Sequence, residues 1–312
     1  MKVLDRIDDG VLDSLAKQDE FFWLDLAGPS AEDIGALAKR FGWHELLVED
    51  LANFGQRPKI DNYGDYMLLV FYGARPGEDT VVDLTEVHLV VSGSYIVSVR
   101  HAGCNELDQL WRKFEAKPER SEQYVVYAVL DALTDTFFPI LSTIDEEIDA
   151  LEDAIVAKPT DEQLQTVFGL KRSLVLMRRV VTPQRDLAAR TIEDIVNLPG
   201  LDPDTRDYYR DVYDHLIRIS DLIDSYRDLL TGAMDVYLST VSNRLNVVMK
   251  QLTVVATVFL PITALTGFFG QNFGWLVGHI HSLWVFLVYG VGGIVLCTIL
   301  LMLWFRRGGF LD

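Results

Sequence analysis

Residues 252–269 read LTVVATVFLPITALTGFF, residues 283–305 read LWVFLVYGVGGIVLCTILLMLWF, and neither run contains a charged residue. A helix that spans a bilayer needs about 20 predominantly apolar residues. The second run has 23 residues and is long enough, whereas the first has 18 and contains four threonines and Pro261. We therefore predict two transmembrane helices, of which the first has one face that does not contact lipid.

Charge is segregated from these two runs along the chain. The 312 residues carry 28 Lys and Arg against 46 Asp and Glu, a net charge of -18. From residue 251 onward the only charges are Arg306, Arg307 and Asp312, so residues 1–250 carry -19. We expect an acidic soluble body followed by a region in contact with the lipid bilayer. A body this acidic lacks the basic face that nucleic acid requires, which argues against nucleic acid as a partner.

The flanks of the two runs predict their orientation. Lys250 precedes the first run and Arg306–Arg307 follow the second, while the 13-residue connection at 270–282 contains no Lys or Arg. By the positive-inside rule, both termini should lie in the cytoplasm and the connection outside. No signal peptide is visible at the N-terminus, so we expect a multi-pass protein of the plasma (cytoplasmic or inner) membrane.

The first 117 residues are predicted to form an α/β (α+β) cytoplasmic domain. Ser30 followed by Asp33 is a helix-capping pattern, and it opens a helix that runs to Gly42. Strand-like runs lie at 21–26, 66–72, 83–91 and 94–99, and a second helical pattern lies at 105–116. Ser92–Gly93 joins the last two strands as a hairpin, which favours mostly antiparallel pairing.

Two long helices are predicted within residues 118–203. Residues 121–157 are amphipathic and end in an acidic patch over 145–153, and Lys158–Pro159 breaks the helix. Thr160 and Gln163 form the next capping pattern and open a more basic helix. Because the break is short, we expect the two helices to lie antiparallel. Residues 197–203 break the chain again.

No proline or other clear stop occurs between Asp204 and Pro261, which predicts one very long helix. If it continues to Phe269, its 66 residues span roughly 100 Å at about 1.5 Å per residue. A helix of this length cannot be buried in one small domain, so we expect an oligomer. The predicted organisation is a domain at 1–117, a helical pair at 118–203, a stalk and first transmembrane helix at 204–269, an outer loop at 270–282, a second transmembrane helix at 283–305 and a cytoplasmic tail at 306–312.

One face of that long helix stays small or polar along its length. Alternating steps of four and three residues give Asp235, Ser239, Ser242, Asn246, Met249, Thr253, Ala256/Thr257, Leu260, Thr263/Ala264 and Gly267. Small and hydroxyl residues also favour helix packing in membranes, which is the alternative explanation. Because the stripe continues from the cytoplasmic part through the bilayer, we predict a hydrated pathway. Two spanning helices cannot enclose a pore, so several subunits would line it.

The segment DVYLSTVSNRLNVVMKQLTVVATVFLPITALTGFFGQNF at 235–273 closely resembles the CorA family of divalent-cation channels, as do QRPKI at 56–60 and RDVYDH at 210–215. The resemblance covers essentially the whole chain. It implies a homopentameric funnel with a cytoplasmic α/β domain, a helical stalk and two C-terminal transmembrane helices, the first lining the pore. It also implies passage of Mg²⁺, with Co²⁺ and Ni²⁺ carried as well, and no covalent cofactor.

The resemblance assigns roles to particular residues. The selectivity tripeptide of the family falls on Gly270, Gln271 and Asn272. With the stripe, it gives a pore-lining set of Asp235, Asn246, Met249, Leu252, Thr253, Thr257, Leu260, Thr263 and Gly267. A regulatory metal site between neighbouring subunits falls on Asp50, with Glu49 beside it, and on Asp211.

The chemistry of Mg²⁺ agrees with these roles. The ion holds its waters tightly, so neutral dipoles such as the Asn272 amide suit it better than a ring of carboxylates, which would hold it too strongly. Rings of leucine suit gating by loss of water. Carboxylates of two chains at Asp50 and Asp211 repel when empty and are bridged by Mg²⁺, so cytoplasmic Mg²⁺ would favour a closed state. Entry at about -100 mV releases about 4.6 kcal/mol per divalent ion, so transport needs no ATP.

The chain departs from the family pattern in its outer loop. Gln271 stands where most of the family has Met, and Gly274 stands where many relatives have Glu. The loop instead contains His279 and His281, which could contact Zn²⁺ or could simply face solvent. A zinc-transporting branch, ZntB, varies the same tripeptide and is thought to couple Zn²⁺ to protons.

Three functions therefore remain open from the sequence. The first is a CorA-type Mg²⁺ channel gated by cytoplasmic Mg²⁺, the second is a ZntB-like proton-coupled Zn²⁺ transporter, and the third is a non-conducting metal-sensing scaffold. An enzyme is not expected, because the sequence shows no nucleophile–base pair and no phosphate-binding loop. Two cysteines, Cys104 and Cys297, are too few for a disulfide framework.

Overall fold

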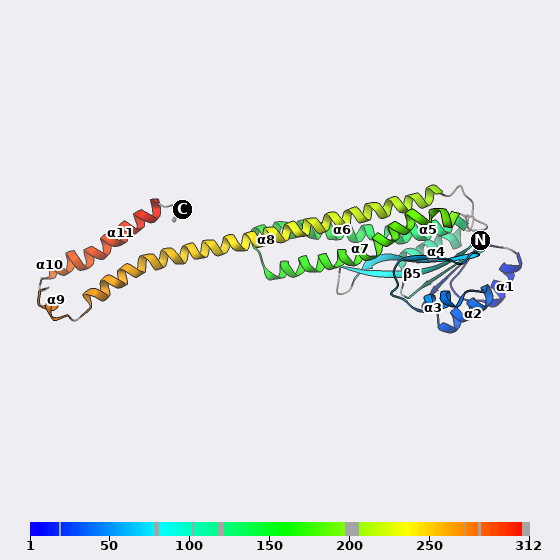
Figure 1. The fold of residues 1–312 in the computed structure, drawn as a ribbon, viewed down its shortest axis with the longest axis horizontal. Coiled ribbons are helices and arrows are strands. Elements are labelled where there is room, and N and C mark those ends of the chain that lie inside the picture. The colour runs from blue at the N-terminus through cyan, green and yellow to red at the C-terminus, as the bar shows by residue number, and fades with distance from the viewer. Residues whose placement is uncertain are drawn as a thin grey trace. The chain divides into compact units, whose positions relative to one another are not determined.

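The computed structural model describes residues 1–18, 20–77, 81–101, 103–117, 122–196, 206–271, 273–279 and 282–307 (Figure 1). The chain divides into two compact units, Met1–Met234 and Asp235–Asp312. The first unit contains the β-sheet, and the described part of the second is helical.

A six-stranded mixed sheet forms the centre of the first unit. Its strands are β1 (Lys2–Leu4), β2 (Phe22–Ala27), β3 (Lys59–Asn62), β4 (Tyr66–Pro76), β5 (Val82–Ser92) and β6 (Tyr95–Arg100), in the order β1-β2-β6-β5-β4-β3. Strands β3 to β6 pair antiparallel, as expected from the hairpin pattern. The two short strands β1 and β3 were not predicted, and β2 pairs parallel with both β1 and β6.

Helices cover both sides of this sheet, with α1–α3 on one side and α4–α7 on the other (Figure 1). They are α1 (Asp9–Gln18), α2 (Ala31–Phe41), α3 (Glu45–Ala52), α4 (Asn105–Ala116), α5 (Glu122–Asp135), α6 (Phe137–Ala157) and α7 (Asp161–Val196). Strand β4 is buried without interruption from Tyr66 to Ala74, because a strand covered on both faces has no solvent-facing side.

The capping pattern of α2 is confirmed. The Ser30 hydroxyl accepts the Asp33 N–H at 3.2 Å, and the Asp33 carboxylate accepts the Ser30 N–H at 2.9 Å. Gly42 ends the helix with a φ of 67°, a left-handed conformation that glycine adopts without strain.

The single helix expected over 121–157 was wrong, because the structure divides it at Thr136 into α5 and α6. Pro139 lacks the N–H that would bond to the Asp135 carbonyl, so one helical hydrogen bond is missing at this point. The Thr136 hydroxyl instead donates to the Leu133 carbonyl and accepts the N–H of Ala74 on β4 at 2.7 Å. The break therefore attaches the helical layer to the sheet.

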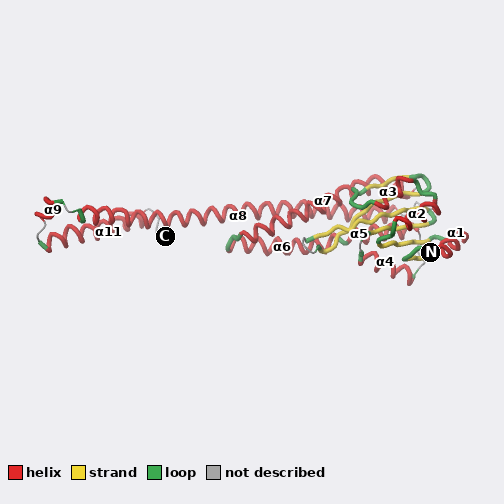
Figure 2. The backbone as a smooth tube through the Cα atoms, turned by 90° about the horizontal axis from the view of Figure 1, so that it is seen from below, coloured by secondary structure: helices red, strands yellow, loops and turns green. Residues whose placement is uncertain are grey.

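Helices α6 and α7 lie side by side (Figures 1 and 2). Only residues 158–160 separate them, so they run antiparallel, as expected. The predicted capping pair is present, with the Gln163 side chain accepting the Thr160 N–H at 3.0 Å. The acidic patch at 145–153 is mostly exposed between buried isoleucines and Leu151, so it forms a solvated face.

Helix α8 (Arg206–Phe269) begins in the first unit and continues into the second. Its first turns bury apolar side chains at helical spacing, among them Tyr209, Val212, Leu216, Ile219, Ile223 and Leu230. The second unit continues with α9 (Gly274–His279), α10 (Leu283–Val285), a π-helical stretch (Phe286–Val291) and α11 (Gly292–Arg307). The break expected at 197–203 lies outside the described residues.

Three described helical stretches are long and apolar enough to cross a membrane, namely Tyr124–Ala157, Asp207–Phe268 and Leu283–Arg307. The most apolar window of the first is 56% buried inside the protein, whereas the other two windows are 0% and 6% buried. Burial against the sheet and α7 accounts for the apolar side chains of the first stretch. The other two contain the runs predicted to span the membrane.

Candidate pore and metal sites

The stripe predicted to line a pathway lies on the part of α8 that belongs to the second unit. Its members Asp235, Asn246, Met249, Leu252, Thr253, Leu260, Thr263 and Gly267 are exposed, and Thr257 is half-buried. Large apolar side chains on the same helix, such as Val255 and Phe259, are also more than half exposed. The rest of the chain therefore covers no face of this segment completely, and apolar surface of this extent requires lipid or further subunits.

Three threonines of the stripe use their hydroxyl hydrogens in hydrogen bonds to their own helix. Thr253, Thr257 and Thr263 donate to backbone carbonyls one turn earlier, with oxygen–oxygen distances of 2.8, 2.7 and 2.8 Å. Since a hydroxyl has one hydrogen and two lone pairs, each oxygen is left as an acceptor. Waters bound to a cation point their hydrogens outward, so such acceptors suit a hydrated ion.

The tripeptide predicted to select ions begins directly after α8. The Gly270 N–H donates to the Thr266 carbonyl at 2.9 Å, and the Gln271 N–H donates to the Phe268 carbonyl at 3.3 Å. A Cβ at Gly270 would lie 3.0 Å from the Thr266 carbonyl oxygen, a tight approach, so glycine fits this helix end without displacing its neighbours. Gln271 is exposed, and Asn272 lies outside the described residues.

His279 lies in the short helix α9, within the connection at 270–282. Its ring stacks on Trp275 with centroids 4.5 Å apart, and its Nδ1 is 2.8 Å from the Trp275 carbonyl oxygen. A nitrogen bonded to a carbonyl must carry the hydrogen, which leaves Nε2 as an acceptor or metal ligand. His281, its predicted companion, lies outside the described residues.

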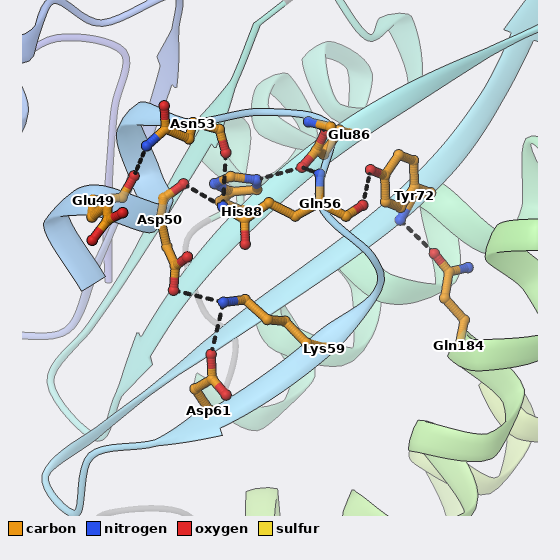
Figure 3. A network of polar contacts seen from close by, with 11 residues as sticks. Glu49, Asp50, Asn53, Gln56, Lys59, Asp61, Tyr72, Glu86, His88 and Gln184 are labelled. Carbon is orange, nitrogen blue, oxygen red and sulfur yellow. Dashed lines mark hydrogen bonds and ion pairs between the residues drawn. The ribbon is translucent and has the colours of Figure 1, made fainter. Parts of the chain in front are cut away.

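Glu49 and Asp50 lie in the second half of α3, at the edge of a cleft of about 570 Å³. Asp50 Oδ2 is 2.6 Å from the Lys59 ammonium, which is also 3.0 Å from Asp61 Oδ2 (Figure 3). Glu49 is exposed and Asp50 is half-buried. The cleft therefore brings three carboxylates and one ammonium together.

The segment between α3 and β3 is fixed by hydrogen bonds to Asp50 and Glu86. The Gln56 side-chain amide donates to the Asp50 carbonyl at 2.8 Å. The Glu86 carboxylate on β5 accepts hydrogen bonds from the Gln56 N–H, at 3.1 Å, and from the Gly55 N–H. It also lies 2.8 Å from His88 Nε2. Burial raises the pKa of Glu86, but these hydrogen bonds outweigh it and the pKa is lowered. Glu86 thus stays ionised and holds the segment in place.

Asp211 lies in a different cluster, on the part of α8 that belongs to the first unit. It accepts the Tyr127 hydroxyl at 3.0 Å, and its Oδ1 is 3.7 Å from His215 Nε2. His215 Nδ1 is 3.2 Å from Asp135 Oδ1 and 3.6 Å from Asp131 Oδ1. Asp131, Asp135 and His215 each place one ligand atom within 4.8 Å of the others, a spacing that one cation can bridge.

The electrostatics of this cluster favour a positive charge. Burial, together with the charges of Asp135 and Asp211, raises the pKa of Asp131 to about 6, although His215 lowers it. Asp131 Oδ1 is buried, and it has no hydrogen-bond partner in the described part of the chain. A cation would satisfy this oxygen and relieve the repulsion among the carboxylates.

The sequence contains a signal for this cluster in the spacing of its members. Asp131 and Asp135 are four residues apart on α5, and Asp211 and His215 are four apart on α8, so each pair lies on one helix face. The meeting of the two faces depends on packing between distant segments, which the sequence alone does not show. The predicted partners Asp50 and Asp211 belong to separate clusters within one chain.

Residues 18–307 match the family model described as CorA-like Mg²⁺ transporter protein. The chain belongs to the CorA family. It is 31% identical to the cobalt/magnesium transport protein CorA of Thermotoga maritima, over 91% of this chain and 82% of that protein. It is also 26% identical to the zinc transport protein ZntB of Yersinia enterocolitica, over 86% of this chain and 82% of that protein.

The fold agrees with this membership. The complete structure of the CorA magnesium transporter from Methanocaldococcus jannaschii aligns with a TM-score of 0.80 and 23% identity, covering 92% of this chain and 90% of that one. The CorA match includes the stripe on α8, both acidic clusters of the first unit and the two apolar stretches. The chain is therefore a CorA-type membrane transporter of divalent cations, a family of transporters rather than enzymes.

Proposed function

We propose that this CorA-family protein is a homopentameric channel for uptake of hydrated Mg²⁺, with Co²⁺ and Ni²⁺ as further cargoes. It works in the cytoplasmic (inner) membrane with both termini in the cytoplasm, and the membrane potential drives the ion inward. The threonine stripe carries this proposal, because its hydroxyl oxygens are left as acceptors on a helix that the chain leaves largely exposed. Leu252 and Leu260, exposed on the same helix, would form the apolar rings that close the pore.

Cytoplasmic Mg²⁺ closes this channel by binding the acidic clusters of the first unit. Asp50 and Glu49 of one subunit would share an ion with Asp211 of the next, and Asp131, Asp135 and His215 would hold a further ion beside it. Support comes from the raised pKa of Asp131 and from the unpaired buried oxygen in that cluster. An ion that relieves repulsion in one arrangement of subunits shifts the population toward it.

The test is ion flux into liposomes that contain the purified full-length protein. Thr257→Val removes the acceptor oxygen but keeps the side-chain shape, and a lost hydrogen bond of about 0.5–1.5 kcal/mol slows Mg²⁺ entry roughly 2- to 10-fold. Thr298→Val is the matched control, because Thr298 on α11 donates to the Ile294 carbonyl at 2.9 Å in the same way. Equal rates for both variants and the parent would refute the pore role of the stripe. Binding of Mg²⁺ without flux at any potential would favour the non-conducting scaffold.

A second candidate is proton-coupled Zn²⁺ transport, as the ZntB branch of the family suggests. The observation that favours it is His279, whose Nε2 is left available in the connection that follows Gln271, since imidazole nitrogen is a common zinc ligand. It predicts Zn²⁺ flux that depends on a pH gradient and falls in the double variant His279→Gln, His281→Gln. Zn²⁺ flux that is indifferent to the pH gradient and to both histidines would exclude it.

A further inference from the structure

The Lys59 ammonium occupies the position between two carboxylates where a metal ion would be expected. It lies 2.6 Å from Asp50 Oδ2 and 3.0 Å from Asp61 Oδ2, as Figure 3 shows. The contact with Asp50 is about as short as a charge-assisted hydrogen bond becomes, whereas the contact with Asp61 is somewhat longer. The acid proposed to bind regulatory Mg²⁺ is thus already paired with a cation from its own chain.

The surrounding fold holds this arrangement in place. Lys59 and Asp61 are two residues apart on the edge strand β3, so their side chains share one face. Asp50 comes from α3, and its backbone carbonyl is fixed by the Gln56 amide at 2.8 Å. The three side chains are 23% to 41% exposed, so the ion pairs are neither fully solvated nor sealed from water.

The cleft has an excess of negative charge even with Lys59 in it. Glu49, Asp50 and Asp61 line it together with Lys59 and Tyr63. Burial lowers the pKa of Lys59, but hydrogen bonds and charges from Asp50 and Asp61 outweigh it, and the pKa is raised. The pKa of the Tyr63 hydroxyl is raised by burial and then by the charges of Asp61 and Asp50. Three carboxylates against one ammonium leave the cleft net negative, so it still attracts cations.

We propose that Lys59 is an internal competitor for the regulatory divalent cation at Asp50. A divalent ion can bind Asp50 closely only after the ammonium has moved out of the cleft. Lys59 then weakens metal binding and sets the concentration of cytoplasmic Mg²⁺ at which the channel closes. This inference rests on the proposed regulatory role of Asp50.

The test compares Mg²⁺ binding by isothermal titration of the full-length protein in detergent with Mg²⁺ inhibition of flux in liposomes. Lys59→Met removes the competing charge and is expected to tighten Mg²⁺ binding about tenfold, with inhibition at correspondingly lower cytoplasmic Mg²⁺. Lys59→Arg keeps the charge and is expected to stay within about twofold of the parent. Lys39→Met, at an exposed position on α2, is the matched control for net charge and is expected to have no effect.

Unchanged or weaker binding in Lys59→Met would overturn the proposal, and Lys59→Gln is measured in parallel to show that the result does not depend on the methionine. Asp50→Asn separates this failure from failure of the proposed function. If Asp50→Asn leaves Mg²⁺ binding unchanged, the regulatory role of Asp50 is wrong and the competitor role is wrong with it. If Asp50→Asn weakens binding while Lys59→Met changes nothing, only the competitor role is wrong.

Discussion

Replacing Asp131 with asparagine should stabilise the protein when divalent cations are removed. The pKa of Asp131 is raised by burial and by Asp135 and Asp211 from its ordinary value of 3.8 to about 6. The folded state therefore holds this proton more tightly than the unfolded state. The contribution of Asp131 to stability is therefore highest below about pH 4, falls as the pH rises from about 4 to 6, and stays lower above that. The asparagine side chain of the variant has no charge to bury, so it avoids this loss.

The size of the stabilisation by Asp131→Asn follows from the shift in the pKa of Asp131. A rise in pKa from 3.8 to about 6 corresponds to about 3 kcal/mol, and because 25% of the Asp131 side chain is exposed, solvent screening reduces this to about 1–2 kcal/mol. For a unit of this size the melting temperature should rise by about 2–8 °C. Thermal unfolding of the full-length protein in detergent, at pH 8 with EDTA, measures it. At pH 4 the parent and Asp131→Asn should melt together.

Mg²⁺ should narrow the difference in melting temperature between the variant and the parent. The ion stabilises the parent by relieving the repulsion at Asp131, so the gain in melting temperature on adding Mg²⁺ at pH 8 should be larger in the parent than in Asp131→Asn. Asp153→Asn, in the exposed acidic patch of α6, is the control and should change stability by less than about 0.5 kcal/mol. An Asp131→Asn variant that is less stable than the parent at pH 8 in EDTA would refute this reasoning.

Two further substitutions test other parts of the structure. In the parent, the Arg100 guanidinium lies 2.7 Å from the buried Asp25 carboxylate. Arg100→Met leaves this carboxylate buried without its partner, so the first unit should lose about 3–5 kcal/mol of stability in denaturant unfolding. A loss under about 1 kcal/mol would show that Asp25 finds another partner. Gly270→Ala places a Cβ 3.0 Å from the Thr266 carbonyl oxygen. The variant should slow ion flux in liposomes, while the first unit should melt at the same temperature as in the parent. Normal flux would show that the helix end can relax.

The helix caps and the long apolar runs were predictable because their signals are local. The Ser30–Asp33 and Thr160–Gln163 caps each lie within one turn, and the apolar run at 283–305 needs no distant residue to be recognised. The stretch Tyr124–Ala157 shows the limit of composition, because it is apolar enough to span a membrane yet its apolar face is buried in the first unit.

Features that depend on distant packing were not predictable. The parallel pairing of β2 with β6 joins residues more than 70 positions apart. The contact of His215 with Asp131 and Asp135 joins two helices more than 75 positions apart. The ion pair of Lys59 with Asp50 joins residues only nine positions apart in the sequence. It still depends on the conformation of the turn between them, which the hydrogen bonds of Gln56 and Glu86 fix.

The division of the chain at Met234 has a consequence for biosynthesis. All of the sheet and its helical cover precede residue 235, so they leave the ribosome before the stripe-bearing part of α8. Synthesis of Asp235 to Arg307 takes about 4–15 s at about 5–20 residues per second. Mixed α/β sheets fold in less time than this. The first unit thus has time to form before synthesis of the two apolar stretches is complete, and variants that slow its folding would deliver an incomplete unit to the membrane.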